Sequence, residues 1–529
     1  MADTARRTEG VYGPGSYTDT TFTPVHQECR RLLRELTAKT PGFTTDERVL
    51  DQVTFEGGDL PVIPGPIKSE AMTAVLQAMV GIVGQEILEL RGLPQSPIRI
   101  NTNQASMYCA MPALPSVDGV DGIELLKNPR LPSFTDGQLH DALKVRITSY
   151  DEGYEMIKQK TQQLSPYDLD MLMLENGLCG SICYTPDAWR RTQMGRSLAR
   201  HPLVNYKEMT HAPHTPPVPF PTVQSDQRPL AGVKVVELAR IIAGPACGMI
   251  LASMGAEVVR VQARRMIDFT PAQLCLMAGK TTYDLDLDRP EDHERLVKLI
   301  NDADVVLGGY RLGSLERRGF GLDALLEMAA ARGKGIVHLN ENCYGLDGYM
   351  AERPGWQQIA DAAAECSYVM GKSFGLPEGQ SVLPSLPIAD MSTGVVAALE
   401  IMMMLRNRAK FGGSWHGNAA LTAFQAASME DWVGLYQPEI VDKIQEKFNF
   451  APLTSKLHVI ELYYMIAAAW KENTDLVSNE KYYTHFNDSV YGKDLRIVAP
   501  VVRYHDEQTT PRWTSPPVPF CQHTNAHWN

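Results

Sequence analysis

The residue with the clearest chemical potential in this chain is Asp390, within the segment PIADMSTG at 387–394. An extended stretch that contains prolines ends there, and a long apolar helix begins. Aspartate is a preferred N-cap residue, so this carboxylate could simply start the helix. A carboxylate at a loop–helix junction beside a ligand crevice could instead act as a nucleophile toward an acyl group. The sequence leaves both interpretations open.

A second candidate site is the turn RIIAGPA at 240–246, which follows the first strand of a predicted sheet. Backbone N–H groups at the start of the next helix would bind a phosphate or another small anion there. The turn is not a G-x-G-x-x-G motif, and Gln262 stands where an NAD-binding protein has an acid for the ribose. We therefore predict no NAD. The nearby arginines Arg260, Arg264 and Arg265 suit a ribose phosphate, with a solvated charged edge as the alternative.

Two other possible motifs do not meet the structural requirements of the sites that they resemble. Gly371–Gly375 matches the G-x-S-x-G nucleophile elbow, but the residues after it cannot form the helix that this elbow requires. The loose groups of cysteine and histidine do not supply four ligands at zinc spacing, so we predict no metal. These groups are Cys179 with Cys183, and Cys521 with His523 and His527.

Strands and helices alternate in the part of the chain that carries these candidates. VKVVEL (233–238), AEVVRVQ (256–262) and ADVVLGG (303–309) are short strands rich in β-branched residues, with helical patterns between them. Such alternation is typical of a parallel sheet covered by helices on both faces. We predict a doubly wound α/β domain at 229–425.

Composition restricts the class of protein. The 529 residues include 50 Lys+Arg and 62 Asp+Glu, a net charge of −12, which argues against nucleic-acid or anionic-membrane partners. No apolar run reaches the roughly 18 residues of a membrane span, and nine cysteines in a chain of this length are typical of reduced thiols. We expect a cytoplasmic protein whose first 20 residues form a disordered arm and whose proline-rich segment 211–228 is a linker.

An internal repeat is the most informative feature of the organisation. PPVPF occurs at 216–220 and again at 516–520, and a proline-rich entry into a long apolar helix occurs from Pro64 and again from Pro384. Chance is the alternative explanation for either echo alone. Both echoes in the same order predict that residues 1–228 are a degenerate partial copy, and that 426–529 closes the complete second copy.

Residues 230–425 resemble family III CoA-transferases, the group that includes formyl-CoA transferase, carnitine CoA-transferase and α-methylacyl-CoA racemase. The resemblance rests on an ordered series of segments. They are LAGVKVVELARIIAGPACGMILASMGAEVVRVQ, AGKTTYDLDLDRPE, ADVVLGGYRLGSLERRGFG, VHLNENCYGLDGYMAERPGWQQIADA and LPIADMSTGVVAALEIMMML.

The resemblance implies a fold, a reaction and a set of residues. Asp390 matches the catalytic aspartate, which attacks an acyl-CoA thioester, forms a mixed anhydride and then carries CoA as an aspartyl thioester. Coenzyme A and a carboxylic acid are therefore the implied substrates, the carboxylic acid being a small molecule or a natural product of secondary metabolism. The family also implies an interlocked homodimer. The positions implied to contact CoA are Ile242, Ala243, Lys280, Gly309, Tyr310 and Arg317, to which we add Arg260 and Arg264 beside the ribose phosphate and Trp356 as further candidate CoA contacts.

The sequence departs from the family pattern at several points, among them Gly309-Tyr-Arg-Leu-Gly313 in place of the family's Asn-Phe-Arg-Pro-Gly. Trp356 stands where the racemases have a base histidine, and the glycine-rich loop that transferases place over the anhydride is not recognisable after Asp390. A CoA-transferase is the leading interpretation. A racemase or epimerase of acyl-CoA remains an alternative, with His416 as a substitute base only if it lies close to Asp390. A scaffold that no longer uses CoA, either non-catalytic or repurposed as an isomerase or cyclase, is the third.

Overall fold

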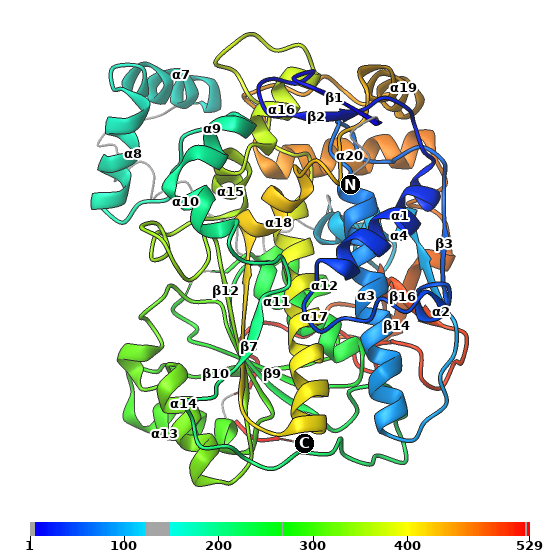
Figure 1. The fold of residues 1–529 in the computed structure, drawn as a ribbon, viewed down its shortest axis with the longest axis vertical. Coiled ribbons are helices and arrows are strands. Elements are labelled where there is room, and N and C mark those ends of the chain that lie inside the picture. The colour runs from blue at the N-terminus through cyan, green and yellow to red at the C-terminus, as the bar shows by residue number, and fades with distance from the viewer. Residues whose placement is uncertain (1–5, 123, 125–148, 267, 524–525, 529) are drawn as a thin grey trace.

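The computed structural model describes residues 6–122, 124, 149–266, 268–523 and 526–528. The strands of its largest sheet are β7 (Tyr206–Glu208), β8 (Lys234–Leu238), β9 (Glu257–Gln262), β10 (Lys280–Asp284), β11 (Val305–Gly308), β12 (Val337–Asn342) and β13 (Trp415–Ala420). They lie in the order β10–β9–β8–β11–β12–β13–β7 (Figure 1). The first six of this order run parallel, and β7 is an antiparallel edge strand.

Successive residues of the parallel strands face opposite sides of the sheet, and helices cover both sides. Val235 belongs to the core beneath α11 (Ala243–Ser253) and α17 (Ile388–Phe411), whereas its neighbour Val236 belongs to the core beneath α13 (Pro290–Asp302) and α14 (Leu322–Ala331). Strands buried on both faces explain the continuous runs of valine and leucine in the sequence. The prediction of a doubly wound α/β sheet is confirmed.

The N-terminal part builds a smaller unit of the same design. β3 (Val53–Glu56) and β4 (Ile98–Asn101) are parallel, α3 (Ser69–Leu90) connects them, and α4 (Thr102–Cys109) follows. The larger unit has the same order, in which α17 connects the parallel pair β12 and β13 and α18 (Leu421–Ser428) follows. The helices α3 and α17 pack against each other, with 2.8 Å between the hydroxyl oxygens of Thr73 and Ser392.

The two units exchange edge strands. β7, which follows the smaller unit in the chain, pairs with β13 of the larger one, and β16 (Val502–Tyr504) returns to pair antiparallel with β4 of the smaller one. A PPVPF segment follows each exchanged strand. The layout agrees with the repeat in the sequence, and duplication stays our hypothesis for its origin. In the folded chain the predicted partial copy and the α/β domain are interlocked.

The remaining elements surround this core. Near the N-terminus they are β1 (Arg7–Glu9), β2 (Tyr17–Asp19), α1 (Val25–Ala38), α2 (Glu47–Leu50), η2 (Met111–Ala113), β5 (Ser116–Val117) and β6 (Val120–Asp121). The middle of the chain adds α7 (Tyr150–Thr161), α8 (Pro166–Glu175), α9 (Pro186–Arg191), α10 (Gln193–Leu198), η3 (Thr270–Ala272), α12 (Gln273–Leu276), η4 (Glu316–Arg318), α15 (Gln357–Ala363) and α16 (Cys366–Ser373). The C-terminal part adds α19 (Pro438–Phe448), α20 (Val459–Asn473), η5 (Glu480–Tyr482), β14 (Tyr483–Asn487) and β15 (Asp494–Val498).

The N-terminal arm differs from its prediction. The strands β1 and β2 pair in antiparallel register, and Leu435 exchanges backbone hydrogen bonds with Tyr17 and Asp19. The Gly- and Thr-rich composition suggested disorder because it carries little apolar surface, but this segment is ordered by backbone bonds to a distant loop. The first five of the twenty residues lie outside the described part of the chain.

The helices α3 and α17 are each long and apolar enough to cross a membrane by length and composition. In each, however, 94% of the most apolar window is buried inside the fold, between the other helices and the sheets. Core helices of soluble proteins often have this length and apolar composition, so these two are weak evidence for a membrane span. A charged residue inside each run, Glu86 in α3 and Glu400 in α17, explains why the sequence did not show an uninterrupted apolar stretch.

Candidate active site

The order of the strands places the site. β9 lies on one side of the first strand, β8, and β11 lies on the other, so the direction of strand addition reverses between β8 and β11. In open α/β sheets a ligand binds in the crevice at the carboxyl ends of the strands where this reversal occurs. The loops after β8 and β11 are therefore the expected walls of a ligand site.

A pocket of about 190 Å³ opens between these loops, and Asp390 lies in it. The residues around it come from four strand ends and from the start of α17. They are Arg240, Ile241, Ile242, Ala243, Gly309, Tyr310, Arg311, Leu312, Glu341, Asn342, Cys343, Ala351, Glu352, Arg353, Pro354, Gly355, Trp356, Asp390 and Leu421.

Asp390 is not the N-cap of its helix. Pro387 takes that position, without a side-chain cap, and Asp390 is the third residue of α17. The Asp390 backbone N–H donates to Oε1 of Gln357 (3.2 Å), and Nε2 of Gln357 donates to the carbonyl of Leu386 (2.7 Å). The capping interpretation is therefore wrong. The carboxylate remains partly exposed to the pocket.

A glycine in the next turn brings this carboxylate close to α11. A Cβ added at Gly394 would lie 2.8 Å from the carbonyl oxygen of Ala243 and 2.7 Å from the Cβ of Ala246. Only glycine allows the first turns of α17 and α11 to approach this closely. The carboxylate of Asp390 and the backbone start of α11 therefore face one pocket.

The pocket holds a second carboxyl group, that of Glu341 at the end of β12. Burial raises the pKa of Asp390 to about 7. Burial and the nearby charge of Asp390 together raise the pKa of Glu341 to about 8. Perturbed carboxyl groups in a cleft are typical of functional sites. The sequence did not single out Glu341, because it lies in a strand, VHLNEN, that carries several other polar residues.

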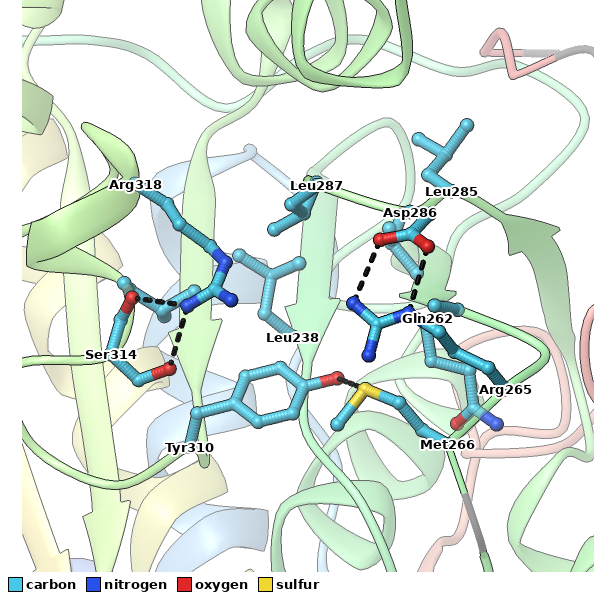
Figure 2. Close-up of a pocket in the computed structure, with 13 residues that line it drawn as sticks. Leu238, Gln262, Arg265, Met266, Leu285, Asp286, Leu287, Tyr310, Ser314 and Arg318 are labelled. Carbon is cyan, nitrogen blue, oxygen red and sulfur yellow. Dashed lines mark hydrogen bonds and ion pairs between the residues drawn. The ribbon is translucent and has the colours of Figure 1, made fainter. Parts of the chain in front are cut away.

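A smaller cavity of about 100 Å³ adjoins the first at Tyr310, which lines both (Figure 2). Arg265 and Arg318 lie on its two sides in Figure 2. Arg265 is bound by Asp286 (2.8 Å) and Arg318 by Asp288 (2.8 Å). We call the two cavities together the crevice; arginines line both parts of it, Arg265 and Arg318 the smaller cavity and Arg240, Arg311 and Arg353 the pocket of Asp390.

The structure gathers five of the predicted CoA contacts around Asp390. Ile242, Ala243, Gly309, Tyr310 and Trp356 all line its pocket.

Two further predicted contacts lie on the surface outside the cavities. Arg264 is paired with Asp284 (3.0 Å), and Arg317 is exposed on η4. In each case the neighbouring arginine, Arg265 or Arg318, is the one that lines the smaller cavity.

Lys280, another predicted contact, lies in the interior instead. Its ammonium is fully buried, 2.7 Å from Glu237 and 2.6 Å from the carbonyl of Pro245, and burial lowers its pKa to about 8. The side chain therefore does not reach the crevice.

Arg260, predicted beside the ribose phosphate, is also buried. It forms ion pairs with Glu237 and Asp268. Oδ1 of Asp268 in turn accepts a hydrogen bond from the backbone N–H of Ile241 (3.1 Å). Ile241 has φ of +69°, which is strained for a β-branched residue and costs about 1–3 kcal/mol. Arg260 thus supports the pocket wall from behind rather than binding a ligand.

The histidines and cysteines lie apart from this pocket. His416 stacks on His338 with 3.1 Å between the Nδ1 atoms, and neither lines the pocket of Asp390, so His416 is not placed as a substitute base. All nine cysteines are free thiols. Within the described residues, no group of three or more His, Cys, Asp or Glu side chains is arranged to hold a metal ion.

Comparison with known proteins shows one relative that matches nearly the whole chain. An acyl-CoA transferase of Gibberella moniliformis is 52% identical over 98% of this chain and 98% of its own length. The family model described as CoA-transferase family III matches residues 230–463. The chain belongs to CoA-transferase family III.

Other relatives of this family III CoA-transferase are more distant. An acetyl-coenzyme A transferase of Hypoxylon pulicicidum is 31% identical over 67% of this chain, which spans 60% of that protein. A CaiB/BaiF family protein from Brucella suis is a solved structure with 18% identity and a TM-score of 0.41, over 56% of this chain and 97% of that one. A Mycobacterium tuberculosis protein has 27% identity and a TM-score of 0.33, over 38% and 56% of the two chains.

Family membership makes the chain an enzyme of the CoA-transferase kind, with acyl-CoA as substrate. The residues that match the family model include the whole parallel part of the large sheet and Asp390. They end within α20, so the N-terminal unit and the last strands lie outside the match.

Proposed function

We propose that this enzyme moves CoA from an acyl-CoA to a free carboxylic acid, with Asp390 as the nucleophile. The observation that carries the proposal is the partly exposed Asp390 carboxylate in a pocket at the strand reversal. The resemblance of the surrounding segments to the family supports it. A pKa of about 7 leaves a substantial fraction ionised at neutral pH and makes the carboxylate more nucleophilic than an exposed aspartate.

The reaction proceeds by exchange of acyl groups on this carboxylate. Asp390 attacks the thioester carbonyl and expels CoA thiolate, which gives a mixed anhydride. The thiolate then attacks the aspartyl carbonyl and releases the first carboxylic acid as its anion. The second carboxylate attacks the resulting aspartyl thioester, expels CoA thiolate and forms a second anhydride. Attack of the thiolate on the acyl carbonyl of that anhydride releases the new acyl-CoA and restores Asp390.

The crevice offers complementary chemistry to the rest of CoA. Arg265 and Arg318 provide positive charge at the end with the smaller cavity, where phosphates would bind. Tyr310 lies between the two cavities and would contact the chain that joins the nucleotide to the thiol. The start of α11 supplies backbone N–H groups beside the acyl carbon.

The mouth of the pocket suggests a bulky, apolar carboxylic acid as acceptor. Trp356 lines the pocket and is 47% exposed, and Leu178, next to Cys179, is 52% exposed. The thiol of Cys179, the residue after Leu178, contacts Trp356, so the chain around Leu178 passes close to the pocket mouth. Aromatic and aliphatic side chains exposed at a pocket mouth are typical of ligand binding. A natural product of secondary metabolism fits this surface better than a short acid does.

Transfer assays with Asp390→Asn test the proposal. Purified enzyme is incubated with acetyl-CoA or succinyl-CoA and a panel of short and bulky apolar carboxylic acids, and acyl-CoA products are measured by mass spectrometry. The neutral amide cannot form the anhydride, so transfer should fall at least about 10³-fold while the melting temperature stays near that of the wild type. In the wild type, kcat/KM should rise with pH through about 7 as Asp390 ionises.

Glu365→Gln is the matched control. This glutamate is also buried with a pKa raised to about 8, but it lies against Arg190 and does not line the pocket. Transfer by the control should equal that of the wild type. Full activity of Asp390→Asn would contradict the proposal. The homodimer that the resemblance implies stays a prediction, which light scattering of the same samples would test.

A further inference from the structure

We propose that Glu341 is a catalytic residue, which donates a hydrogen bond from its carboxylic acid to the acyl carbonyl oxygen while Asp390 attacks the carbonyl carbon. The inference rests on the proposed function and adds to it the group that stabilises the tetrahedral oxyanion.

A glycine makes room for the side chain of Glu341. The side chain leaves the end of β12 and is 9% exposed, in the same pocket as Asp390. A Cβ at Gly309 would lie 3.0 Å from Oε2 of Glu341, closer than side chains normally approach, whereas a Cβ at Gly244 would lie at an ordinary contact distance of 3.7 Å. The absence of a side chain at Gly309 therefore lets this carboxyl group lie against the loop after β11, near the start of α11.

Glu341 differs from the other buried glutamates in having no partner. Among the described residues, none forms a hydrogen bond or an ion pair with its carboxyl group. The others are all held: Glu28 by Arg31, Glu70 by the N–H of Val62, Glu237 by Lys280, Glu365 by Arg190 and Glu400 by the N–H of Asn205. The carboxyl group of Glu341 is not sealed in the interior, because the side chain lines the pocket. Its oxygens are therefore available to a ligand that enters there.

The surroundings of Glu341 determine its protonation state. The titratable and charged groups that face the pocket or lie against it are Arg240 after β8, Cys247 in α11, Tyr310 and Arg311 after β11, Cys343, Glu352 and Arg353 after β12, and Asp390 in α17. Burial, reinforced by the charge of Asp390, raises the pKa of Glu341 to about 8. Asp390 is the more exposed of the two carboxyl groups, so the negative charge favours Asp390, and near neutral pH the pocket holds one carboxylate and one carboxylic acid.

The first step of the reaction requires an ionised Asp390 beside a protonated Glu341. The Asp390 oxygen forms a bond to the acyl carbon while the π electron pair of the carbonyl moves onto its oxygen. The O–H of Glu341 donates to that oxyanion and keeps its proton. When the carbonyl re-forms, the carbon–sulfur bond breaks and CoA leaves as thiolate. A preorganised donor to such an oxyanion is worth about 10²–10³ in kcat.

The pH dependence of CoA exchange tests the role. Isotope-labelled CoA is exchanged into acetyl-CoA or succinyl-CoA, whichever the wild type accepts, by wild type, Glu341→Gln, Glu341→Ala and Glu365→Gln from pH 5.5 to 9.5. The wild type should give a bell-shaped profile that falls above about pH 8, where Glu341 loses its proton. Glu341→Gln keeps an N–H donor that does not titrate, so it should retain most of the rate and lose the alkaline limb. Glu341→Ala should lose about 10²-fold in kcat at pH 7.

Two results would overturn the proposal while leaving Asp390 in place. One is an unchanged alkaline limb in Glu341→Gln, and the other is a Glu341→Ala variant that exchanges CoA as fast as the wild type. Glu365→Gln should show the wild-type profile, which separates Glu341 from a general effect of buried carboxyl groups. If the wild type itself catalyses no CoA exchange, both this inference and the proposed function fail.

Discussion

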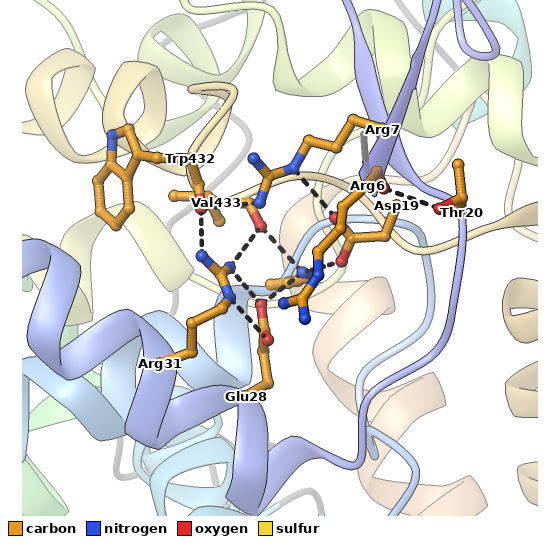
Figure 3. Close-up of polar contacts among 9 residues, drawn as sticks. Arg6, Arg7, Asp19, Thr20, Glu28, Arg31, Trp432 and Val433 are labelled. Atoms are coloured by element: carbon orange, nitrogen blue, oxygen red, sulfur yellow. Dashed lines mark hydrogen bonds and ion pairs between the residues drawn. The ribbon is translucent and has the colours of Figure 1, made fainter. Parts of the chain in front are cut away.

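Replacing Lys68 by methionine should destabilise the whole chain, because one buried ammonium connects three distant segments. Lys68 precedes α3 and is 1% exposed. Its Nζ contacts Glu28 of α1 (2.6 Å), the carbonyl of Val433 (2.9 Å) and Asp19 of β2. Figure 3 shows the partners from β2, α1 and the loop at 432–433 converging on one point. The helix that Lys68 precedes also supports α17, which carries Asp390.

The contacts of Lys68 determine how much the free energy of unfolding should fall in Lys68→Met. Removal of one partner from a buried ion pair costs about 3–5 kcal/mol, because the remaining charge stays buried. Here Glu28 keeps Arg31 (3.0 Å) and Asp19 keeps Arg7 (3.1 Å), so we expect the lower end, about 3 kcal/mol. The exposed pair Arg48–Asp46 is the matched control, and Arg48→Ala should leave the free energy of unfolding near that of the wild type.

Urea unfolding of the two variants, followed by tryptophan fluorescence at several pH values, measures this effect. Burial alone would raise the pKa of Glu28, but Arg31 and Lys68 outweigh it and lower the pKa to about 2. This stabilisation is complete above pH 4.5 and is lost as pH falls toward 2. The difference between wild type and Lys68→Met should therefore narrow over that interval. A loss below 1 kcal/mol at pH 7, or a constant difference down to pH 2, would refute the reasoning.

Two further predictions concern the interlocked halves and the crevice. Residues 229–529 expressed alone should be insoluble or lack cooperative unfolding, since β16 loses its partner β4 and α17 loses α3; a stable, active fragment would contradict this. Arg318→Ala and Arg265→Ala should each weaken CoA binding in calorimetry several-fold, more at low salt, whereas Arg264→Ala, outside the cavity, should not. Equal affinity in all three variants would place the phosphates elsewhere.

Much of the large domain was predictable from local patterns. The alternation of strands and helices predicted the parallel sheet, because valine-rich strands such as 233–238 are stable only when both faces of the sheet are covered. The exchange of β7 and β16 was not predictable, since edge strands of three residues carry almost no sequence signal. The ordered structure of residues 6–20 was not predicted for a similar reason. It depends on backbone hydrogen bonds to Leu435, more than 400 positions away in the chain.

The site was predictable in part. Asp390 and the turn at 240–246 follow from loop–helix junctions, which a sequence shows directly. The directions in which the arginine side chains point cannot be predicted from such local patterns. Arg260 lies within β9 and points into the core, whereas Arg265 lies beyond the strand end and reaches the cavity. The role proposed for Glu341 depends on Gly309 and Asp390, which lie on other elements, so no local pattern identifies it.

The most direct test of the account is chemical trapping of the intermediate on Asp390. Wild-type enzyme is incubated with acetyl-CoA or succinyl-CoA and hydroxylamine, digested with protease and examined by mass spectrometry. An acyl-activated or thioester-linked aspartate should yield an aspartyl hydroxamate at Asp390, only when acyl-CoA is present and not in Asp390→Asn. Modification at another residue, or turnover of acyl-CoA by Asp390→Asn at the wild-type rate, would contradict the central role of this carboxylate.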